Sequence, residues 1–441
     1  MPITNWWPFR RNKKKTVQST VNVYDVNQRV YTPVAQLKLG MYVIELDRPW
    51  LDSPFLFQGF ELQTEDDIRK VREVCEYVYI DVTKSRKKVV EYKGGQENLS
   101  LDSIADFPPP PPKLSVFEKE IERAESVYQE MGELVSDFME RIARGEGVDT
   151  KAAKAAVAEC VNSILHSPDA FLWLSQLKNR DEYTAQHSLN VCALAIVLGR
   201  HLNFSVSNLN LVGLCGMMHD MGKMLIPLEI LNKPGKLDAD EMEIMRSHTS
   251  LGHELLKSSS DMYLGAIETA LTHHETLDGK GYPRRIKDKG ISLFTRMVTI
   301  VDMYDAMTSD RVYQKGRTHL EATSIMSNLS GSQLDGRLVV KFIEALGVYP
   351  PGSLVQMTNG AIAIVVEVNE LARLRPKVII LLDSEGQPVE ERVVNLAEMV
   401  LDKRGNVLTI KGIVRPQDYG IDISKYYRQG VLQKGFAQSR A

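Results

Sequence analysis

The chain has 441 residues, of which 43% are hydrophobic and 25% are charged, and its formal net charge is −3. This charge gives no global attraction to nucleic acid or to a membrane surface, so no DNA partner is expected. Four widely spaced cysteines without a C-x-x-C pair indicate neither a disulfide framework nor a structural zinc ribbon. No apolar run approaches the roughly 20 residues that cross a bilayer, and the start has no apolar signal-peptide core. We therefore expect a soluble cytoplasmic protein with two or three domains and no transmembrane segment.

The N-terminal residues 1–107 are predicted to form a small α/β regulatory domain behind a basic tail. The tail, WWPFRRNKKK, is compatible with binding to an anionic membrane or to nucleic acid, but a solvated terminus is the favoured interpretation. From about Tyr31, short β-rich runs alternate with turn residues. The stretch TEDDIRKVREVCEYVYID then predicts a helix followed by a strand.

A proline run and a long helix are predicted to connect the domains over residues 108–147. Five consecutive prolines, Pro108 to Pro112, form a stiff extended spacer. Residues 114–144 then carry a heptad pattern, which is compatible with a homodimeric coiled coil or with a helix packed on its own domain. The seam residues are Phe117, Ile121, Ala124, Tyr128, Met131, Val135, Phe138 and Ile142. Further helices are predicted to begin after Asp149 and at Ser167-Pro168.

Histidines and aspartates recur in or beside apolar helices of the central region. Burial of carboxylates and of several imidazoles costs free energy unless they are paired or bound to a metal, so this pattern indicates a cation. The candidate ligands are His187, His219, Asp220, His248, His273, His274 and Asp302. His201, His253 and His319 have no partner at ligand spacing and are not assigned to the site.

The order H…HD…H…HH…D resembles that of the HD-domain metal-dependent phosphohydrolases, and the motif HHETLDGKGYP narrows the resemblance to their HD-GYP subfamily. The similarity covers roughly residues 170–347. It implies a mainly α protein with a helical HD-type catalytic domain over residues 148–348. It also implies a phosphodiesterase of bacterial second-messenger signalling that hydrolyses cyclic di-GMP to pGpG, with further hydrolysis to GMP left open.

The resemblance implies two metal ions per chain, with the Asp220 carboxylate bridging them. One ion would be held by His187, His219, Asp220 and Asp302, and the other by Asp220, His248, His273 and His274. Five imidazoles and two carboxylates suit iron or manganese, and other transition metals stay open. Some members use a Glu four residues before the first His to hold a third metal. This chain has Tyr183 there, and Glu182 is displaced by one residue, so we expect a dinuclear site.

The resemblance also implies residues that contact the substrate. Lys223 in HDMGK resembles the family's phosphate-binding lysine, with a catalytic role beside Asp220, and Arg311 in SDRVY resembles its substrate arginine. Asp181 is assigned to orienting the substrate or a ligand histidine. Gly279 and Gly281 permit a tight loop that presents Lys280 and Tyr282 beside the site, with Tyr282 stacking on a guanine or bracing the loop.

Several alternatives follow from the same residues. The loop is linked in the subfamily to docking with GGDEF domains, so a GGDEF protein is a candidate partner. The chain is alternatively a phosphohydrolase of another cyclic nucleotide, or a scaffold that binds cyclic di-GMP or a GGDEF protein with weak turnover. Glu275 is interpreted as holding a histidine tautomer, and Asp305 as a polar helix residue or a hydrogen-bond partner of a ligand.

A β-rich extension is predicted over residues 349–441. After the helical stretch GRLVVKFIEALG, the sequence YPPGSLVQMTNGAIAIVVEVN changes sharply to a β pattern, and Asn359-Gly360 is a hairpin signal. We expect the extension to pack on the helical core and the tail after Tyr427 to be loosely ordered.

Overall fold

The computed structural model describes residues 29–46, 60–62, 64–75, 77–81, 113, 116–177, 183–310, 315–369, 372–402 and 404–439. The chain divides into two compact units, Met1–Glu91 and Tyr92–Ala441. The basic tail, the proline run, Asp181, Glu182 and Arg311 lie outside the described residues. Among the residues described, no helix has both the length and the apolarity needed to cross a membrane.

The first unit is an antiparallel sheet with one helix. The strands are β1 (Arg29–Pro33), β2 (Tyr42–Leu46), β3 (Phe60–Glu61) and β4 (Tyr77–Asp81), in the order β1-β4-β2-β3. The 3-10 helix η1 (Val34–Gln36) follows β1, and helix α1 (Glu65–Val74) begins at a capping box formed by Thr64 and Asp67. The predicted succession of helix and strand is confirmed by α1 and β4. Ile68 and Val71 of α1 are buried with residues of the sheet in one small core.

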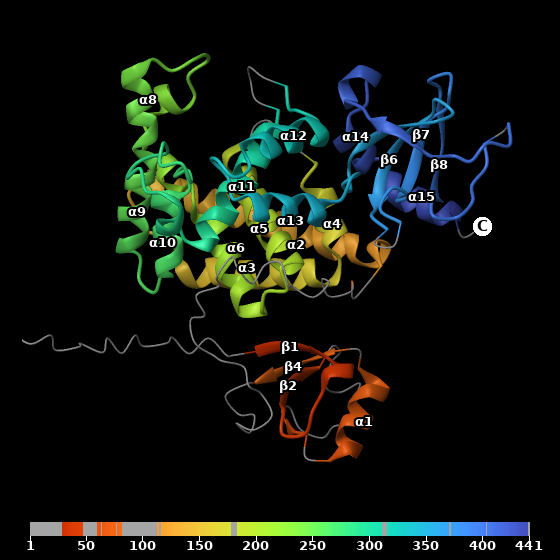
Figure 1. The fold of residues 1–441 in the computed structure, drawn as a ribbon, viewed down its shortest axis with the longest axis horizontal. Coiled ribbons are helices and arrows are strands. Elements are labelled where there is room, and N and C mark those ends of the chain that lie inside the picture. The colour runs from red at the N-terminus through yellow and green to blue at the C-terminus, as the bar shows by residue number, and fades with distance from the viewer. Residues whose placement is uncertain are drawn as a thin grey trace, which may run out of the picture. The chain divides into compact units, whose positions relative to one another are not determined.

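The second unit is built around helices α2 (Phe117–Ala143), α3 (Thr150–His166), α4 (Pro168–Leu174), α5 (Tyr183–His201) and α6 (Val206–Met218). Asp149 caps α3 by accepting a hydrogen bond from the N–H of Ala152, and Pro168 is the first residue of α4, as predicted. Helices α5 and α6 are apolar on nearly all faces because other helices surround them (Figure 1). They form the centre of the unit.

The heptad seam of α2 packs inside its own chain. Seam residues such as Phe117, Met131 and Phe138 are buried in the same core as α3, α5 and α6. The structure therefore supports the alternative interpretation, a helix packed on its own domain, and gives no support for a homodimer through this seam. A helix that faces a domain core and one strand of a coiled coil share this periodicity, so the pattern alone did not distinguish them.

The remaining helices complete the unit, and two of the candidate ligands, His248 and Asp302, lie on them. They are η4 (Met221–Leu225), α7 (Leu228–Leu231), α8 (Ala239–Arg246), α9 (His248–Ser258), α10 (Leu264–Thr272), η5 (Asp288–Gly290), α11 (Leu293–Thr308), α12 (His319–Leu329) and α13 (Gly336–Leu346). Gly222 of η4 lies so close to α9 that a Cβ there would come within 2.0 Å of the His248 carbonyl oxygen. This close approach brings His248 beside Asp220.

The C-terminal extension is an antiparallel sheet of β5 (Leu354–Met357), β6 (Ile362–Glu367), β7 (Lys377–Leu382), β8 (Pro388–Asn395) and β9 (Ile410–Ile413), in the order β8-β7-β6-β5-β9. The predicted hairpin joins β5 to β6, with Gly360 at a φ of 93°. One face of the sheet, including Ile364 and Leu381, joins the helical core, and the other face has a core of its own. The predicted mainly α fold, with an α/β unit before it and a β-rich extension after it, is confirmed.

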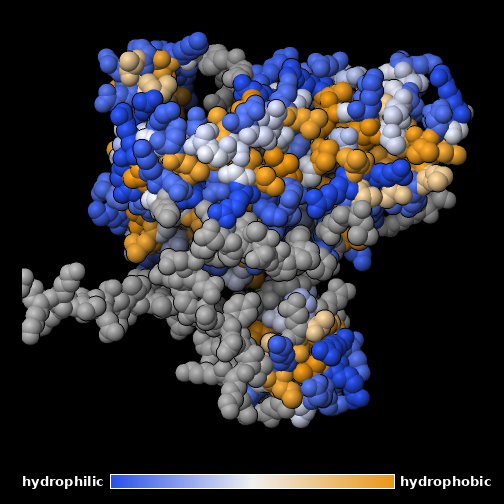
Figure 2. Space-filling model, in the orientation of Figure 1, coloured by the Kyte–Doolittle hydropathy of each residue, from blue (hydrophilic) through white to orange (hydrophobic). Residues whose placement is uncertain are grey.

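Residues 428–439 are ordered, so the prediction of a loose tail after Tyr427 is wrong for this part of the chain. After η6 (Pro416–Tyr419), helices α14 (Ile423–Arg428) and α15 (Val431–Ser439) follow, and α15 packs on β8. Val431 and Leu432 are buried, and the Phe436 ring centroid lies 6.1 Å from that of Phe117. These apolar residues share one face of α15, a spacing that the sequence reading overlooked. Figure 2 also shows hydrophobic residues at the surface of this end of the unit.

Candidate metal centre

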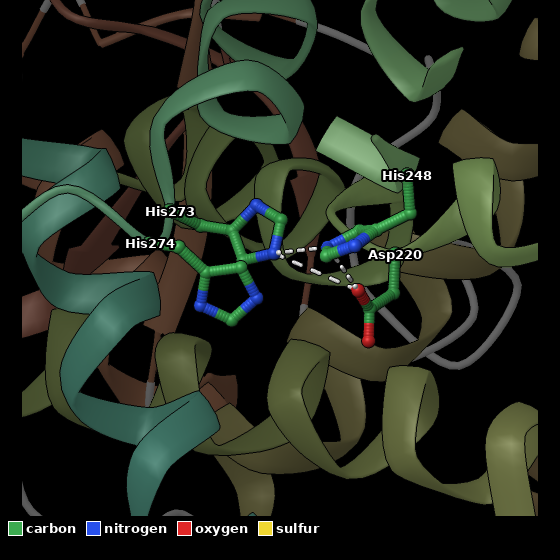
Figure 3. Close-up of side chains that lie close together, drawn as sticks. All are labelled: Asp220, His248, His273 and His274. Atoms are coloured by element: carbon green, nitrogen blue, oxygen red, sulfur yellow. Dashed lines mark hydrogen bonds and ion pairs between the residues drawn. The ribbon is translucent and has the colours of Figure 1, made fainter. Parts of the chain in front are cut away.

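The seven predicted ligands converge from five helices and the segments that follow them. His187 lies on α5, His219 and Asp220 follow α6, His248 begins α9, His273 and His274 follow α10, and Asp302 lies on α11. They form two groups in which possible ligand atoms lie within 4.8 Å of one another. One group is Asp220, His248, His273 and His274 (Figure 3), and the other is His187, His219 and Asp302.

Asp220 lies between the two groups. Its Oδ1 atom is 3.4 Å from Nε2 of His248 and 3.6 Å from Nε2 of His273. Its Oδ2 atom is 3.2 Å from Nε2 of His219 and 3.6 Å from Nε2 of His187. Each carboxylate oxygen therefore faces a different group, which is the arrangement that a bridging ligand requires.

Four histidines are held with Nε2 directed into the site. The Nδ1 atom of each lies within hydrogen-bond distance of an oxygen that accepts, so Nδ1 carries a proton, and in a neutral ring Nε2 then keeps its lone pair. The Nδ1 pairs are His219 with the Gly216 carbonyl at 2.7 Å, His248 with the Met245 carbonyl at 2.7 Å, His273 with the Thr269 carbonyl at 3.1 Å, and His187 with the Asp305 carboxylate at 2.7 Å.

Two buried ligand atoms lack hydrogen-bond partners within the described part of the chain. They are Nε2 of His219 and Oδ1 of Asp220, and both side chains are almost completely buried. A buried acceptor without a partner costs about 1–3 kcal/mol. A divalent cation would satisfy both atoms, and the nitrogen and oxygen donors suit a transition metal, so these residues fit a bound metal ion.

Burial and neighbouring charges change the pKa values of the ligands. Burial lowers the pKa of His248 to about 4 and holds that of His274 well below its usual range, so both rings are neutral near pH 7. Burial also opposes the charged form of His187, but the carboxylates of Asp302 and Asp305 outweigh it and raise the pKa to about 9. A cation bound to Nε2 of His187 would therefore displace a proton.

Asp305 and Asn190 support His187 from behind. Asp305 accepts a hydrogen bond from His187 at one oxygen and, at 3.0 Å, from Nδ2 of Asn190 at the other. Of the two predicted roles of Asp305, contact with a ligand is the correct one. Sequence reasoning missed Asn190, although its position three residues after His187 on the same helix face was a usable signal.

The loop after His274 is fixed by its own backbone. The carboxylate of Glu275 is buried and accepts hydrogen bonds from the N–H groups of Arg284 and Ile286. The prediction that Glu275 holds a histidine tautomer is therefore wrong, because its oxygens point at this loop. At Gly281, a Cβ would come within 2.4 Å of the His274 carbonyl oxygen, so a glycine is required there.

Tyr282 lies against the ligand cluster. Its ring centroid is 4.7 Å from that of His274 at an interplanar angle of 31°, and the Arg246 guanidinium lies 5.2 Å from the Tyr282 centroid. This contact joins the loop to one of the metal-ligand groups.

Comparison with known proteins agrees with this geometry. Residues 170–338 match the HD domain family, residues 30–153 match a domain of unknown function, and residues 354–416 match a KOW domain associated with the HD domain. The chain is 36% identical over 372 residues to a cyclic di-GMP phosphodiesterase of Pseudomonas aeruginosa, which covers 82% of this chain and 88% of that protein. The chain belongs to the HD-GYP family.

Other relatives of this HD-GYP chain match a shorter part of it. A cyclic di-GMP phosphodiesterase of Thermotoga maritima is 36% identical over 167 residues, which are 37% of this chain and 45% of that protein. A 3'3'-cGAMP-specific phosphodiesterase of Vibrio cholerae is 32% identical over 171 residues, which are 39% of this chain and 37% of that protein.

The residues predicted to contact the substrate of this HD-GYP chain lie in different surroundings. Lys223 is paired with Asp220 through its ammonium group, and Tyr282 packs on His274. Lys280 is 84% exposed at its side chain, with Nζ 3.4 Å from Oδ2 of Asp278 in the same loop. Asp181 and Arg311 lie outside the described residues, as does the side chain of Tyr183.

Proposed function

We propose that this HD-GYP chain is a metal-dependent phosphodiesterase that opens cyclic di-GMP to linear pGpG. The observation that carries the proposal is the position of Asp220, whose two oxygens face two separate groups of ligand atoms. The name of the Pseudomonas aeruginosa relative, with 36% identity over most of both chains, supports this substrate. Further hydrolysis of pGpG to GMP is left to product analysis.

The proposed cofactor is a pair of divalent cations, iron or manganese, with Asp220 bridging. His187, His219 and Asp302 would complete one site, and His248, His273 and His274 the other. When bound, such a pair supplies a nucleophile at neutral pH and neutralises charge on the phosphate. The fixed Nδ1 protons of His219, His248 and His273 keep their Nε2 atoms available as ligands.

Residues of this chain would bind and orient the dinucleotide. The Lys223 ammonium, which is paired with Asp220 in this structure, would contact a phosphate oxygen. The guanidinium of Arg311 would form a bidentate contact with the same phosphate. Tyr282 would stack on a guanine, and Lys280 and Asp181 would contact the substrate at the edge of the site. The exposed Lys280 and the loop around it are also the proposed contact with a GGDEF-domain protein.

The deciding experiment measures metal content and products on the same preparation. Protein purified without oxygen is expected to hold two ions of iron or manganese per chain and to convert cyclic di-GMP to pGpG. Three tightly held ions would contradict the dinuclear site. An Asp220→Ala variant separates the enzyme from a scaffold: if signalling output survives without metal or hydrolysis, the chain acts as a scaffold.

A second candidate substrate is 3'3'-cGAMP, since relatives of Vibrio cholerae are named for it. Its two bases differ, whereas cyclic di-GMP has two guanines. Comparison of kcat/KM for the two dinucleotides on one metal-loaded preparation decides between them. A higher value for 3'3'-cGAMP would overturn the proposed substrate and leave the metal centre intact.

A further inference from the structure

A continuous line of hydrogen bonds joins helix α2 to the candidate metal ligand His187. The Tyr128 hydroxyl of α2 donates to Oδ1 of Asn190 at 2.9 Å. Nδ2 of Asn190 donates to Oδ1 of Asp305 at 3.0 Å, and Oδ2 of Asp305 accepts from Nδ1 of His187 at 2.7 Å. Three hydrogen bonds therefore separate α2 from the imidazole.

The direction of each hydrogen bond in this line is fixed by its neighbours. Asp305 can only accept as a carboxylate, so the amide of Asn190 must present its NH₂ group to it. Oδ1 of Asn190 then faces Tyr128 and requires a donor there. The Tyr128 hydroxyl also lies 3.2 Å from Nε2 of Gln186, which can only donate to it. The Tyr128 proton is thus the one that holds the Asn190 amide in the orientation that supports Asp305.

The position of Tyr128 is itself fixed by packing. Its ring centroid lies 5.5 Å from that of Phe171 on α4 in an edge-on contact at 61°. Val127 and Met131, on the same side of α2, are buried in the main core. Burial raises the pKa of Tyr128 above its ordinary value, so the hydroxyl keeps its proton across the neutral range. The donor is therefore held in place and cannot be lost by ionisation.

We propose that Tyr128 is a positioning residue for the metal ligand His187, acting through Asn190 and Asp305. The inference rests on the proposed role of His187 as a ligand. Loss of the Tyr128 hydroxyl leaves Oδ1 of Asn190 without this donor, and the amide can then rotate away from Asp305. Asp305 in turn holds His187 less firmly. This line of hydrogen bonds connects α2, the helix that follows the proline run in sequence, to the proposed metal centre.

The expected effect is confined to one of the two metal ions. Removal of a residue that hydrogen-bonds a ligand costs roughly 10- to 100-fold in metal affinity, so loss of the Tyr128 hydroxyl, which lies two hydrogen bonds beyond Asp305, is expected to cost about fivefold. The ion held by His187 should therefore leave a Tyr128→Phe variant about fivefold faster, whereas the ion held by His248, His273 and His274 should leave at the wild-type rate. A merely structural effect would loosen both ions and lower the melting temperature of the metal-free chain.

The test follows loss of manganese from the full chain into excess chelator, with melting of the metal-free chain as a second measurement. Tyr304→Phe is the matched control, since it removes another core tyrosine hydroxyl, one that pairs with His319 at 2.9 Å. Asn190→Leu cuts the line between its ends. In the Asn190→Leu background, Tyr128→Phe is expected to cause no further increase in the release rate of the ion held by His187.

Two outcomes would overturn the inference alone. A third variant, His187→Ala, tests the proposed function on which the inference rests. If the Tyr128→Phe variant releases both ions at the same rates as the wild-type chain or the Tyr304→Phe control, Tyr128 has no positioning role. If its effect adds fully to that of Asn190→Leu, the two residues act independently and the line is refuted. If His187→Ala keeps two ions with unchanged release, His187 is not a ligand, and the proposed metal centre fails together with the inference.

Discussion

The carboxylate of Glu275 accepts a hydrogen bond from the backbone N–H of Arg284 at 2.6 Å. Its second oxygen accepts from the N–H of Ile286 at 3.1 Å. One buried carboxylate thus closes the loop that carries Lys280 and Tyr282, starting from the residue next to His274. The candidate ligand His274 and the residue that fixes the proposed substrate loop are therefore adjacent in sequence.

We expect Glu275→Ala to raise KM for cyclic di-GMP by about tenfold, because each lost hydrogen bond to a buried carboxylate contributes about 1–2 kcal/mol to loop order. Tyr282 would then leave His274 for part of the time. Metal content per chain should stay at the wild-type value. Steady-state kinetics and elemental analysis check both statements.

The control for Glu275 is Glu268→Ala, which removes the partner of the Arg284 side chain in a half-exposed ion pair. Such pairs contribute little, so KM should change less than twofold. Equal effects of the two substitutions, or loss of metal from Glu275→Ala, would contradict the role assigned to Glu275.

Asp220→Ala should lose both metal ions and all turnover, whereas His248→Ala should keep one ion. The reason is that the oxygens of Asp220 face both ligand groups, while His248 belongs to one of them. Elemental analysis after gel filtration gives the metal count, and circular dichroism shows whether each variant is folded. An Asp220→Ala variant that is folded and keeps two ions would refute the bridging position.

Removal of metal from the wild-type chain should lower its melting temperature. A ligand that binds the folded state alone stabilises it in proportion to the logarithm of its concentration over Kd. The buried His219 and Asp220 atoms lose their proposed partner when metal leaves. Readdition of manganese should restore the melting temperature in wild type and leave Asp220→Ala unchanged.

Lys113→Met is expected to lower the free energy of unfolding by about 3 kcal/mol, the usual cost of leaving one member of a buried ion pair alone. The Lys113 ammonium is paired with Asp169 of α4 and donates to the Val368 carbonyl at 2.9 Å beside β6. Burial raises the pKa of Asp169, and loss of the lysine raises it further, so the deficit should shrink as the pH falls and the carboxyl becomes protonated. Urea unfolding followed by fluorescence measures both effects.

Lys377→Met is the matched control for Lys113. Lys377 also forms an ion pair, with Glu367 at 2.8 Å, but its side chain is 37% exposed. Its loss should cost less than about 1 kcal/mol. If the two variants lose the same free energy, Lys113 does not act as a buried anchor.

The sequence was sufficient to predict that these histidines and aspartates gather in space, because the chemistry of a metal site constrains both residue type and order. Imidazoles and carboxylates seldom gather on apolar helices unless they are paired or bind a metal, and the motif HHETLDGKGYP has a fixed spacing. The two groups found in the structure match the two that the resemblance implied, and Asp220 lies near the histidines of both, as the resemblance also implied. The predicted hairpin at Asn359-Gly360 followed from local turn chemistry in the same way.

What the sequence did not predict depends on contacts between distant segments. Tyr128 and Asn190 are 62 residues apart, and Tyr128 looked like one more apolar position of a heptad seam. Glu275 stands beside a ligand histidine in sequence, but its oxygens point to residues 284 and 286, which no periodicity indicates. The order of α15 depends on a strand of the extension against which its apolar face is buried.

His319 provides a test of pH dependence away from the metal centre. Its Nδ1 lies 2.9 Å from the Tyr304 hydroxyl and its Nε2 lies 3.1 Å from the Gly347 carbonyl oxygen, so the neutral ring has a donor on one side and an acceptor on the other. Burial lowers its pKa to about 4. An unfolded histidine titrates near 6.5, so between these values the unfolded chain binds a proton that the folded chain does not.

The free energy of unfolding should therefore fall with pH as the pH drops below about 6.5, and His319 alone should account for a loss of about 2 kcal/mol between about pH 7.5 and pH 5.0. A His319→Gln variant cannot titrate. The variant should have a lower free energy of unfolding than wild type near pH 7.5, and this gap between the two proteins should narrow by about 2 kcal/mol near pH 5.0. The other histidines titrate alike in both chains and therefore cancel in the comparison. Urea unfolding of the metal-free proteins at the two pH values measures the gap, and a gap that stays constant or widens would show that His319 is not held neutral by its burial.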